Sequence, residues 1–406
     1  MNRHSQIVKC PLRLWIATCF ALILISSNAN ELDALYDEDK STDIETILPP
    51  AFLKGGEYEF DESAEQDNLF YKFSVNTNFG RLQVASIAML RRRLGEITKL
   101  DEIQRLRVAQ EDVGEFISYS EDDVFSDALG TAWRIRRTTQ AQLDETKTTE
   151  PPTPKPAADD DFPTVQWRTA AARLGLDPYS SFPPVQKALQ LLSKELGSSR
   201  FPNNVSSVAA TRVFEARFPI DDNFEFETVS VIKNSSVSEL RTRTAELLIS
   251  ADIALAARAQ FMNNEGYTES DRFRFARLLQ SLTKLDAKTL LVSSASTADT
   301  EVDGLAFLNY LRLASAYNNR VEPLNSILGI TRYPALVSEG KTGLLALPID
   351  YLPWNERTAK LAEALIASRD EMELRGFTVV ILGKPTELAR AKLNEMGVKL
   401  IEGISL

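Results

Sequence analysis

A serine and two lysines have the spacing in this chain that is most suggestive of a reaction. Ser281-Leu282-Thr283-Lys284 places an amine one helical turn from a hydroxyl, and Lys341-Thr342-Gly343 offers a second lysine on a predicted strand. A lysine beside a serine can accept its proton and make the oxygen a nucleophile. This pattern supports one hypothesis, a hydrolase that acts through Ser281, Lys284 and Lys341.

The same spacing is too frequent here to identify a nucleophile by itself. Ser-x-x-Lys also begins at Ser230 and at Ser338. Ser281 stands at the end of a predicted helix, whereas a serine nucleophile of this type stands at a helix start. Only 60 residues separate Ser281 from Lys341, which leaves little room for the helical region between the two motifs. We therefore keep the hydrolase as the alternative to a non-enzymatic role.

Carboxylates gather at one place where they could hold a hard cation. Glu121, Asp122, Asp123 and Asp127 lie within seven residues, and oxygen ligands suit calcium or magnesium. An exposed acidic turn has the same composition and is the preferred interpretation. Asp122, Asp123 and Asp127 are thus weak metal candidates.

Two further segments favour ordinary helix starts over ligand sites. Asp299 to Gly304 resembles the first half of a calcium loop, but Tyr310 stands where the loop requires a bidentate glutamate. Acids at this point suit a helix N-terminus. Leu382 to Thr386 follows a predicted strand, yet its single glycine is far from a glycine-rich phosphate loop. We predict no cofactor.

Three consecutive arginines, Arg91-Arg92-Arg93, accompany a predicted helix that begins near Ser86. They lie off its apolar stripe, and acids are interleaved with them, so we predict a solvated charged face. Weak contact with an anionic membrane surface is the alternative. The stripe consists of Ile87, Leu90, Leu94, Ile97, Leu100, Ile103 and Leu106.

The chain begins with the features of a secretory leader. Three basic residues and no acid precede an uncharged run of 12 residues, Leu14 to Ile25, and small residues precede a predicted cleavage after Ala29. The run is shorter than the roughly 20 apolar residues of a spanning helix. A retained anchor and lipidation at Cys19 are the alternatives. We expect a periplasmic or secreted protein.

Removal of this leader would take away the single histidine, His4, and both cysteines, Cys10 and Cys19. The remaining chain then has no disulfide, no zinc site built from Cys and His, and no histidine triad. Its acids and bases are Asp, Glu, Lys and Tyr. Because the leader has three basic residues and no acid, its loss changes the formal net charge from −11 to −14. So acidic a chain is a poor partner for nucleic acid.

Local patterns predict two hairpins, several helices and an α/β end. In each predicted hairpin, apolar and polar residues alternate in two segments that are separated by turn residues. The first hairpin joins Leu69–Val75 to Arg81–Ala85, and the second joins Thr211–Phe218 to Phe224–Ile232. Helical periods or caps predict helices in the intervening segments, and strand, helix and strand follow each other at the C-terminus. The predicted helices are 165–174, 183–196, 238–259, a helix beginning after Thr268, 301–317, 354–374 and 385–396; residues 286–295 suit helix or strand.

Three motifs resemble a group of exported proteins of Gram-negative bacteria for which no activity is established. They are Ala172 to Ser181, which contains Leu174-Gly175-Leu176-Asp177-Pro178-Tyr179, Pro348 to Trp354, and Arg375 to Val380. The resemblance implies an exported protein with an N-terminal hairpin and helix and an α/β end. In that group a segment rich in small apolar residues follows the second helix of the pair. Here the corresponding stretch, Phe201 to Ile232, is charged, aromatic and strand-like. The resemblance supplies no catalytic residue.

Together these patterns predict a mixed α+β fold in which helices predominate. We expect an exported envelope protein with a binding or structural role, whose partner is another envelope protein or polymer. The predicted parts are a signal peptide at 1–29, a disordered acidic segment at 30–50, a hairpin-plus-helix domain at 51–139, a Pro/acidic linker at 140–162, a helical pair and hairpin at 163–235, and a helical and α/β domain at 236–406.

Overall fold

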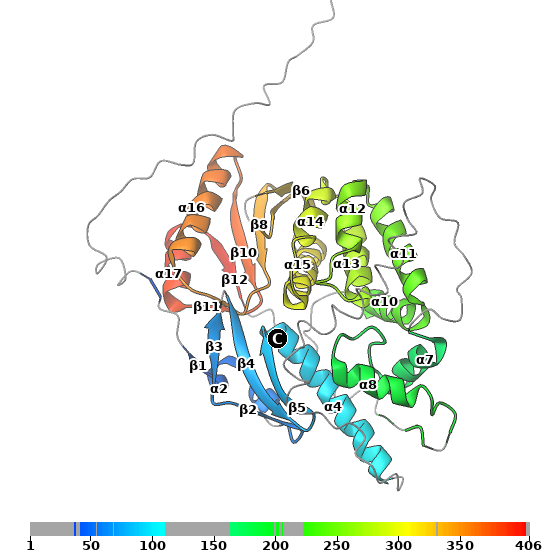
Figure 1. Ribbon diagram of the computed structural model, residues 1–406. Coiled ribbons are helices and arrows are strands. Elements are labelled where there is room, and N and C mark those ends of the chain that lie inside the picture. The colour runs from blue at the N-terminus through cyan, green and yellow to red at the C-terminus, as the bar shows by residue number, and fades with distance from the viewer. Residues whose placement is uncertain are drawn as a thin grey trace, which may run out of the picture.

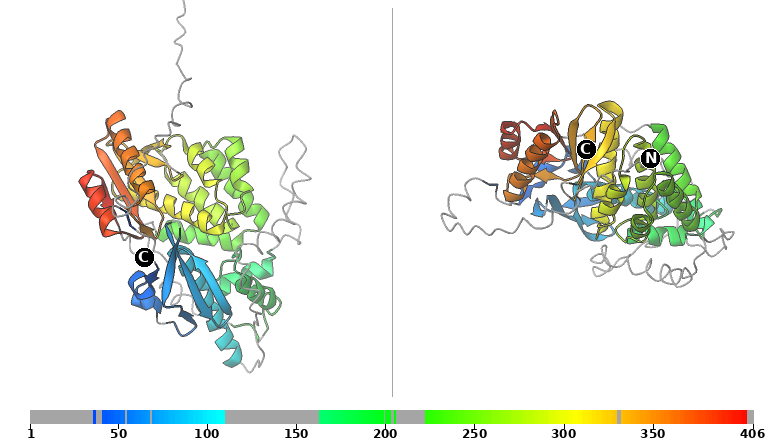
Figure 2. Two further views of the ribbon diagram at one scale, coloured as in Figure 1. Left: turned by 60° about the vertical axis from the view of Figure 1, so that its left-hand side comes forward. Right: turned by 90° about the horizontal axis from the view of Figure 1, so that it is seen from above.

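The computed structural model describes residues 36–37, 41–53, 55–67, 69–109, 163–198, 200–202, 205, 222–329 and 332–402. Helices predominate in this part of the chain, and they accompany two larger sheets (Figure 1). The predicted mixed α+β class is therefore confirmed. Two further views show the same separation of the sheets, one N-terminal and one C-terminal (Figure 2).

The N-terminal sheet is antiparallel and built on β4. Strand β5 pairs with one side of β4, while β3 and β2 pair in succession with the other side. Thr77 pairs with Gly80 across a two-residue turn, and Gly80 has a φ of +107°, which glycine adopts without strain. The first predicted hairpin is thus confirmed. The strands are β1 (Thr42–Asp43), β2 (Tyr58–Phe60), β3 (Ser63–Asp67), β4 (Phe70–Thr77) and β5 (Gly80–Ala85).

The described part of the acidic segment 30–50 differs from the solvated tether that we expected. Residues 42–53 form β1 and two short helices, α2 (Ile44–Ile47) and α3 (Pro50–Leu53). Ile44 and Leu48 are buried in the core, four residues apart. Asp43 and Glu45 flank Ile44 at exposed positions, so a segment rich in charge still carries one apolar face.

Helix α4 (Ile87–Ala109) runs from the centre of the molecule along the N-terminal sheet (Figure 1). Six of the seven residues in the predicted stripe are almost fully buried, and Leu106 is partly buried. Beside it lie α7 (Val165–Leu174) and α8 (Pro183–Leu192), the predicted helical pair. Gly175 ends α7 in the left-handed region, with a φ of +69°.

The second predicted hairpin is wrong in its described half. Residues Phe224 to Ile232 belong to a helix, α10 (Asp222–Asn234), while Thr211 to Phe218 lie outside the described residues. Phe224, Thr228 and Ile232 are spaced four residues apart, a spacing that fits one face of a helix as well as one face of a strand. Thr228 and Ile232 are buried. Packing on α7 and α13 favours the helical period over the strand period.

The predicted helix 238–259 is two helices, α11 (Val237–Ser250) and α12 (Leu255–Met262). Asp252 between them has a φ of +58°, which interrupts the helical backbone. The cap of α11 is Ser236, which forms a capping box with Glu239. Next come α13 (Glu269–Ser281), α14 (Lys288–Ala295) and α15 (Glu301–Arg320).

The C-terminal sheet has the order β12-β10-β8-β7-β6. Strands β8, β10 and β12 are parallel, with α17 as the predicted crossover between the last two. The strands of this sheet are β6 (Leu324–Leu328), β7 (Ala335–Ser338), β8 (Thr342–Leu347), β10 (Gly376–Ile381) and β12 (Lys399–Ile401). A separate pair consists of β9 (Tyr351–Leu352) and β11 (Lys384–Pro385), and the helices of this part are α16 (Glu356–Glu371) and α17 (Glu387–Glu395).

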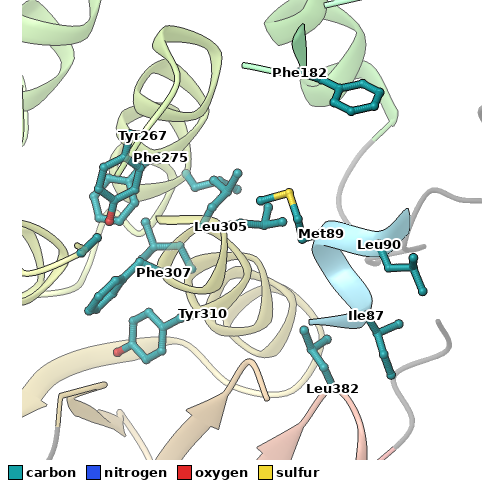
Figure 3. Packing of buried hydrophobic residues seen from close by; sticks show 14 of the residues in the cluster. Ile87, Met89, Leu90, Phe182, Tyr267, Phe275, Leu305, Phe307, Tyr310 and Leu382 are labelled. Atoms are coloured by element: carbon teal, nitrogen blue, oxygen red, sulfur yellow. The ribbon is translucent and has the colours of Figure 1, made fainter. Parts of the chain in front are cut away.

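One hydrophobic cluster receives side chains from all three predicted structured parts. Figure 3 shows Ile87 and Met89 of α4 near Leu382 and Leu305, and Phe182 of the helical pair lies in the same cluster. None of the described helices combines the length and the apolar character needed to span a bilayer.

Candidate functional site

The structure places the three residues of the hydrolase hypothesis in ordinary structural roles. The Ser281 hydroxyl donates to the carbonyl of Leu278 at 2.7 Å, inside its own helix. The Lys284 amine donates to Glu339 at 2.8 Å. Lys341 is exposed at the turn before β8, with a φ of +62°. Within the described chain, no hydrogen bond joins either lysine to Ser281.

The metal candidates Asp122, Asp123 and Asp127 lie outside the described residues. Among those described, no three His, Cys, Asp or Glu side chains are grouped so that they could hold a metal ion. The segment from Asp299 is a helix start, because Thr300 and Asp303 form the capping box of α15. At Gly383 an added Cβ would lie 1.6 Å from the carbonyl oxygen of Asp350, so this glycine permits a close backbone approach.

The expectation that Arg91, Arg92 and Arg93 form a solvated face is wrong. Arg91 is 3% exposed and Arg93 only 1%. Arg92 makes a bidentate pair with Asp271 of α13, at 2.8 Å for both nitrogens, and a further bond to Glu301 of α15 at 3.0 Å. The basis for a membrane contact through these arginines is therefore removed.

Arg93 is the centre of the same buried network. Its guanidinium donates to Glu96 at 2.9 Å, to Glu301 at 2.8 Å and to the Ser181 hydroxyl at 2.9 Å. Ser181 in turn donates to Glu301, and Ser180 donates to Glu96. Helices α4, α13 and α15 and the connection between α7 and α8 thus share one set of charges.

The pKa values of these carboxyls follow from burial and from the arginines. Burial raises the pKa of Asp271, but Arg92 outweighs that effect and holds the pKa at about 2. Burial also raises the pKa of Glu301, and Arg93 and Arg92 reverse it, so that the pKa falls below its usual value. At Glu96 burial prevails over Arg93 and Ser180, and the pKa is raised. The network is compensated and largely shielded from solvent, so its evident role is to hold the fold.

The motif Leu174 to Ser181 explains how the connection reaches this network. Asp177 accepts from the N–H of Tyr179 at 2.9 Å and from Ser270 of α13 at 2.7 Å. The Trp167 indole donates to the carbonyl of Pro178 at 3.0 Å. These bonds direct Ser180 and Ser181 toward Glu96 and Glu301, so the motif is a structural clamp.

A second buried charge joins the N-terminal sheet to the C-terminal one. The Asp350 carboxylate accepts from the backbone N–H of Tyr71 at 3.0 Å and of Ile87 at 2.9 Å. Burial raises its pKa to about 7, and these N–H groups and Arg91 only partly oppose that rise. Burial lowers the pKa of Arg91 to about 10. No hydrogen bond to another described residue engages the Arg91 guanidinium, which lies 4.8 Å from the centre of the Phe52 ring.

A groove that is open to solvent lies at the other end of the N-terminal sheet. It is a groove of about 880 Å³ beside β2, within the volume range of ligand pockets. Six carboxylates line it, together with the end of α3, both glycines before β2 and the β4–β5 turn. The acids are Asp43, Glu45, Glu57, Glu59, Asp61 and Glu62.

Local chemistry fixes the walls of this groove. Asp43 caps α2 by accepting from the N–H of Glu45 at 3.2 Å. The Tyr58 hydroxyl donates to the carbonyl of Phe52 at 2.8 Å and fastens α3 beside β2. A Cβ on Gly55 would lie 2.3 Å from the Tyr58 ring, so glycine permits the chain to pass against that ring.

The charge of the groove is only partly compensated. Glu57 pairs with Arg105 at 3.4 Å and Asp61 with Arg81 at 2.7 Å. Glu45, Glu59 and Glu62 are exposed, and none forms an ion pair with a described basic residue. Several like charges around a concave surface raise the negative potential there and attract cations.

Sequence reasoning did not single out this groove. A usable signal was present in Glu57-Tyr58-Glu59-Phe60-Asp61, where acids and aromatic residues alternate as in a half-buried strand. Its contact with Asp43 to Glu45 depends on tertiary structure.

Comparison of the chain with protein families, with curated proteins and with solved structures finds no match. The groove and the buried network therefore have to be interpreted from their own chemistry.

Proposed function

We propose that this is an exported, non-enzymatic binding protein of the bacterial envelope, and that its acidic groove holds a cationic envelope component. The observation that carries the proposal is the groove of about 880 Å³ with six carboxylates in its lining. The leader motif supports export. Elsewhere in the described chain the buried charges are mostly engaged with one another.

The groove suits binding better than reaction. Among the described residues, its lining contains no lysine or serine, and its carboxylates are open to water or paired with arginine. General acid catalysis by a carboxyl normally requires a desolvated environment that raises its pKa. Attraction of a cation requires only uncompensated charge, which Glu45, Glu59 and Glu62 supply.

Calorimetric titration with spermine at low salt tests the groove. A variant with Glu45→Gln, Glu59→Gln and Glu62→Gln should bind spermine about three-fold to a hundred-fold more weakly, since each of the three exposed charge contacts contributes roughly 0.2–1 kcal/mol. The matched control carries Glu246→Gln, Glu363→Gln and Glu371→Gln, which are exposed on α11 and α16. Equal affinity in the two variants, or no binding to the wild type, would contradict the proposal.

Export has a separate measurement, the intact mass of the protein recovered from fractionated cells. A species that starts at Asn30 in the soluble envelope fraction is expected. A full-length or lipidated species in the membrane fraction would replace the exported binding protein by an anchored one.

A further inference from the structure

We propose that the groove binds an extended, lysine- or arginine-rich peptide segment of another protein, and that this segment adds as a strand to the outer edge of β2. The proposal rests on the proposed function, because it specifies the class of cation and its mode of binding. Strand addition combines backbone hydrogen bonds at a sheet edge with side-chain contacts to either side.

The first support is the position of β2 in the sheet. Val75 of β4 pairs with Leu82 of β5 on one side and with Phe60 of β2 on the other. In the described sheet β2 pairs only with β4 and ends the strand order. Such an edge presents backbone donors and acceptors to an incoming strand.

The hydrogen-bond register shows which groups face outward. The N–H of Asp61 donates to the carbonyl of Ser74 at 3.1 Å, and Glu59 is paired with Asn76 two residues along. In an antiparallel ladder alternate residues bond to the same neighbour. The N–H and C=O of Phe60 therefore point away from β4, and no hydrogen bond to another described residue engages them.

The second support is the end of β1. Strand β1 covers the outer flank of β3 through Thr42 and Asp43, and the N–H of Ile44 donates to Glu62 at 3.1 Å. The chain then turns into α2 and leaves the outer flank of β2 facing the groove. An added strand would lie in line with β1 and would occupy that flank.

The third support is charge. Glu59 of β2 and Asp61, just after its end, flank Phe60, and Glu45 and Glu62 stand at the end of the groove beside β1. A strand paired with β2 lies about 4.8 Å away, within reach of these carboxylates for a long basic side chain. Alternate lysines or arginines on such a strand would meet the acids from one face.

Acids at a sheet edge also have a purely protective use, since they prevent copies of a chain from pairing edge to edge. A groove beside the edge distinguishes the two cases, because it provides room for a second strand. The experiment has to separate strand pairing both from protection and from simple charge attraction.

The probe is an acetylated, amidated octapeptide of alternating lysine and threonine, titrated calorimetrically into the full chain. Two derivatives carry backbone N-methyl groups, one on every lysine and one on every threonine. Strand addition predicts that one derivative binds at least ten-fold more weakly than the parent, because its methyl groups face β2, while the other stays within about three-fold. The Phe60 amide should exchange at least ten-fold more slowly when the parent peptide is bound.

Equal binding of both derivatives, with unchanged exchange at Phe60, would overturn strand addition and leave the cationic groove intact. Binding of spermine without binding of the parent peptide would do the same. Failure of both spermine and the peptide would overturn the proposed function as well. The Glu45, Glu59 and Glu62 variant should lose the peptide at least ten-fold, and the Glu246, Glu363 and Glu371 control should not.

Discussion

Two charged regions of this protein have opposite arrangements. Around Arg92 and Arg93 the carboxylates of Glu96, Asp271 and Glu301 are buried, and arginine or serine donors engage them. Around β2 the carboxylates are mostly exposed, and four of the six have no basic partner in the described chain. The first arrangement joins four segments of the fold, whereas the second faces solvent.

The difference teaches where to look for function in a chain that has neither histidine nor cysteine after Cys19. A buried and compensated network gives a fold specificity at a large desolvation cost. An open and uncompensated groove contributes little to stability and creates a field outside the molecule. Substitutions should therefore separate stability from binding between the two regions.

The largest effect is expected from Arg93→Met. The change leaves Glu96 and Glu301 buried without their main counter-charge, which typically destabilises a protein by about 3–5 kcal/mol. Urea unfolding at neutral pH measures the loss. Arg105→Met is the control, since that side chain is 67% exposed, and it should lose no more than about 1 kcal/mol. A loss of less than about 1 kcal/mol for Arg93→Met would show that the network is not structural.

The next effect concerns Asp350 and pH. Because burial raises its folded-state pKa from 3.8 to about 7, the folded protein holds the proton more tightly than the unfolded chain. This group's contribution to stability is therefore complete below about pH 4 and is lost as the pH rises to about 7. Three pKa units correspond to on the order of 4 kcal/mol.

Asp350→Asn retains an acceptor for the N–H groups of Tyr71 and Ile87 but removes the titration. Unfolding measured from pH 4 to pH 8 should show a flatter profile for this variant than for the wild type. Asp370→Asn, whose side chain is 65% exposed, should keep the wild-type profile. If the wild-type and Asp350→Asn profiles coincide, the Asp350 carboxyl does not titrate in this range.

A smaller effect is expected from Ser180→Ala. It removes the hydroxyl donor to Glu96, and a hydrogen bond to a charged group contributes about 1.5–3 kcal/mol. Ser281→Ala should cost less than about 1 kcal/mol, because that hydroxyl only bonds to its own helix. Urea unfolding compares the two. Labelling of the wild type by a fluorophosphonate probe, abolished in Ser281→Ala, would instead restore the hydrolase hypothesis.

The smallest effect on stability is expected in the groove. The variant with Glu45, Glu59 and Glu62 changed to glutamine should unfold within about 0.5 kcal/mol of the wild type per substitution. Added salt should stabilise the wild type more than the variant, because it screens repulsion among the acids. A large loss of stability in the variant would mean that the groove acids hold the fold, and the contrast between the two regions would disappear.

Much of the local structure could be predicted from the sequence. The β4–β5 hairpin, the stripe of α4, the helix end at Gly175 and the C-terminal strand–helix–strand unit depend on residues that are neighbours in the chain. Periodicity, caps and turn residues report such short-range preferences directly. The mixed α+β class follows from their sum.

Contacts between distant residues decided two features that periodicity, caps and turn residues did not predict correctly. The strand-like alternation of Phe224 to Ile232 became a helix because its four-residue stripe meets α7 and α13. Arg93 became buried because Ser181 and Glu301, 88 and 208 residues away, complete its hydrogen bonds.

The groove follows the same rule. The acids near β2 are plain in the sequence, but their opening toward solvent depends on where β1 stops and how α3 is fastened to Tyr58. Composition and local periodicity determined the acidic character of this protein and many of its helices and strands. Which charges are buried and which stay exposed was decided by contacts between distant residues, because desolvation and pairing exist only once the chain has folded.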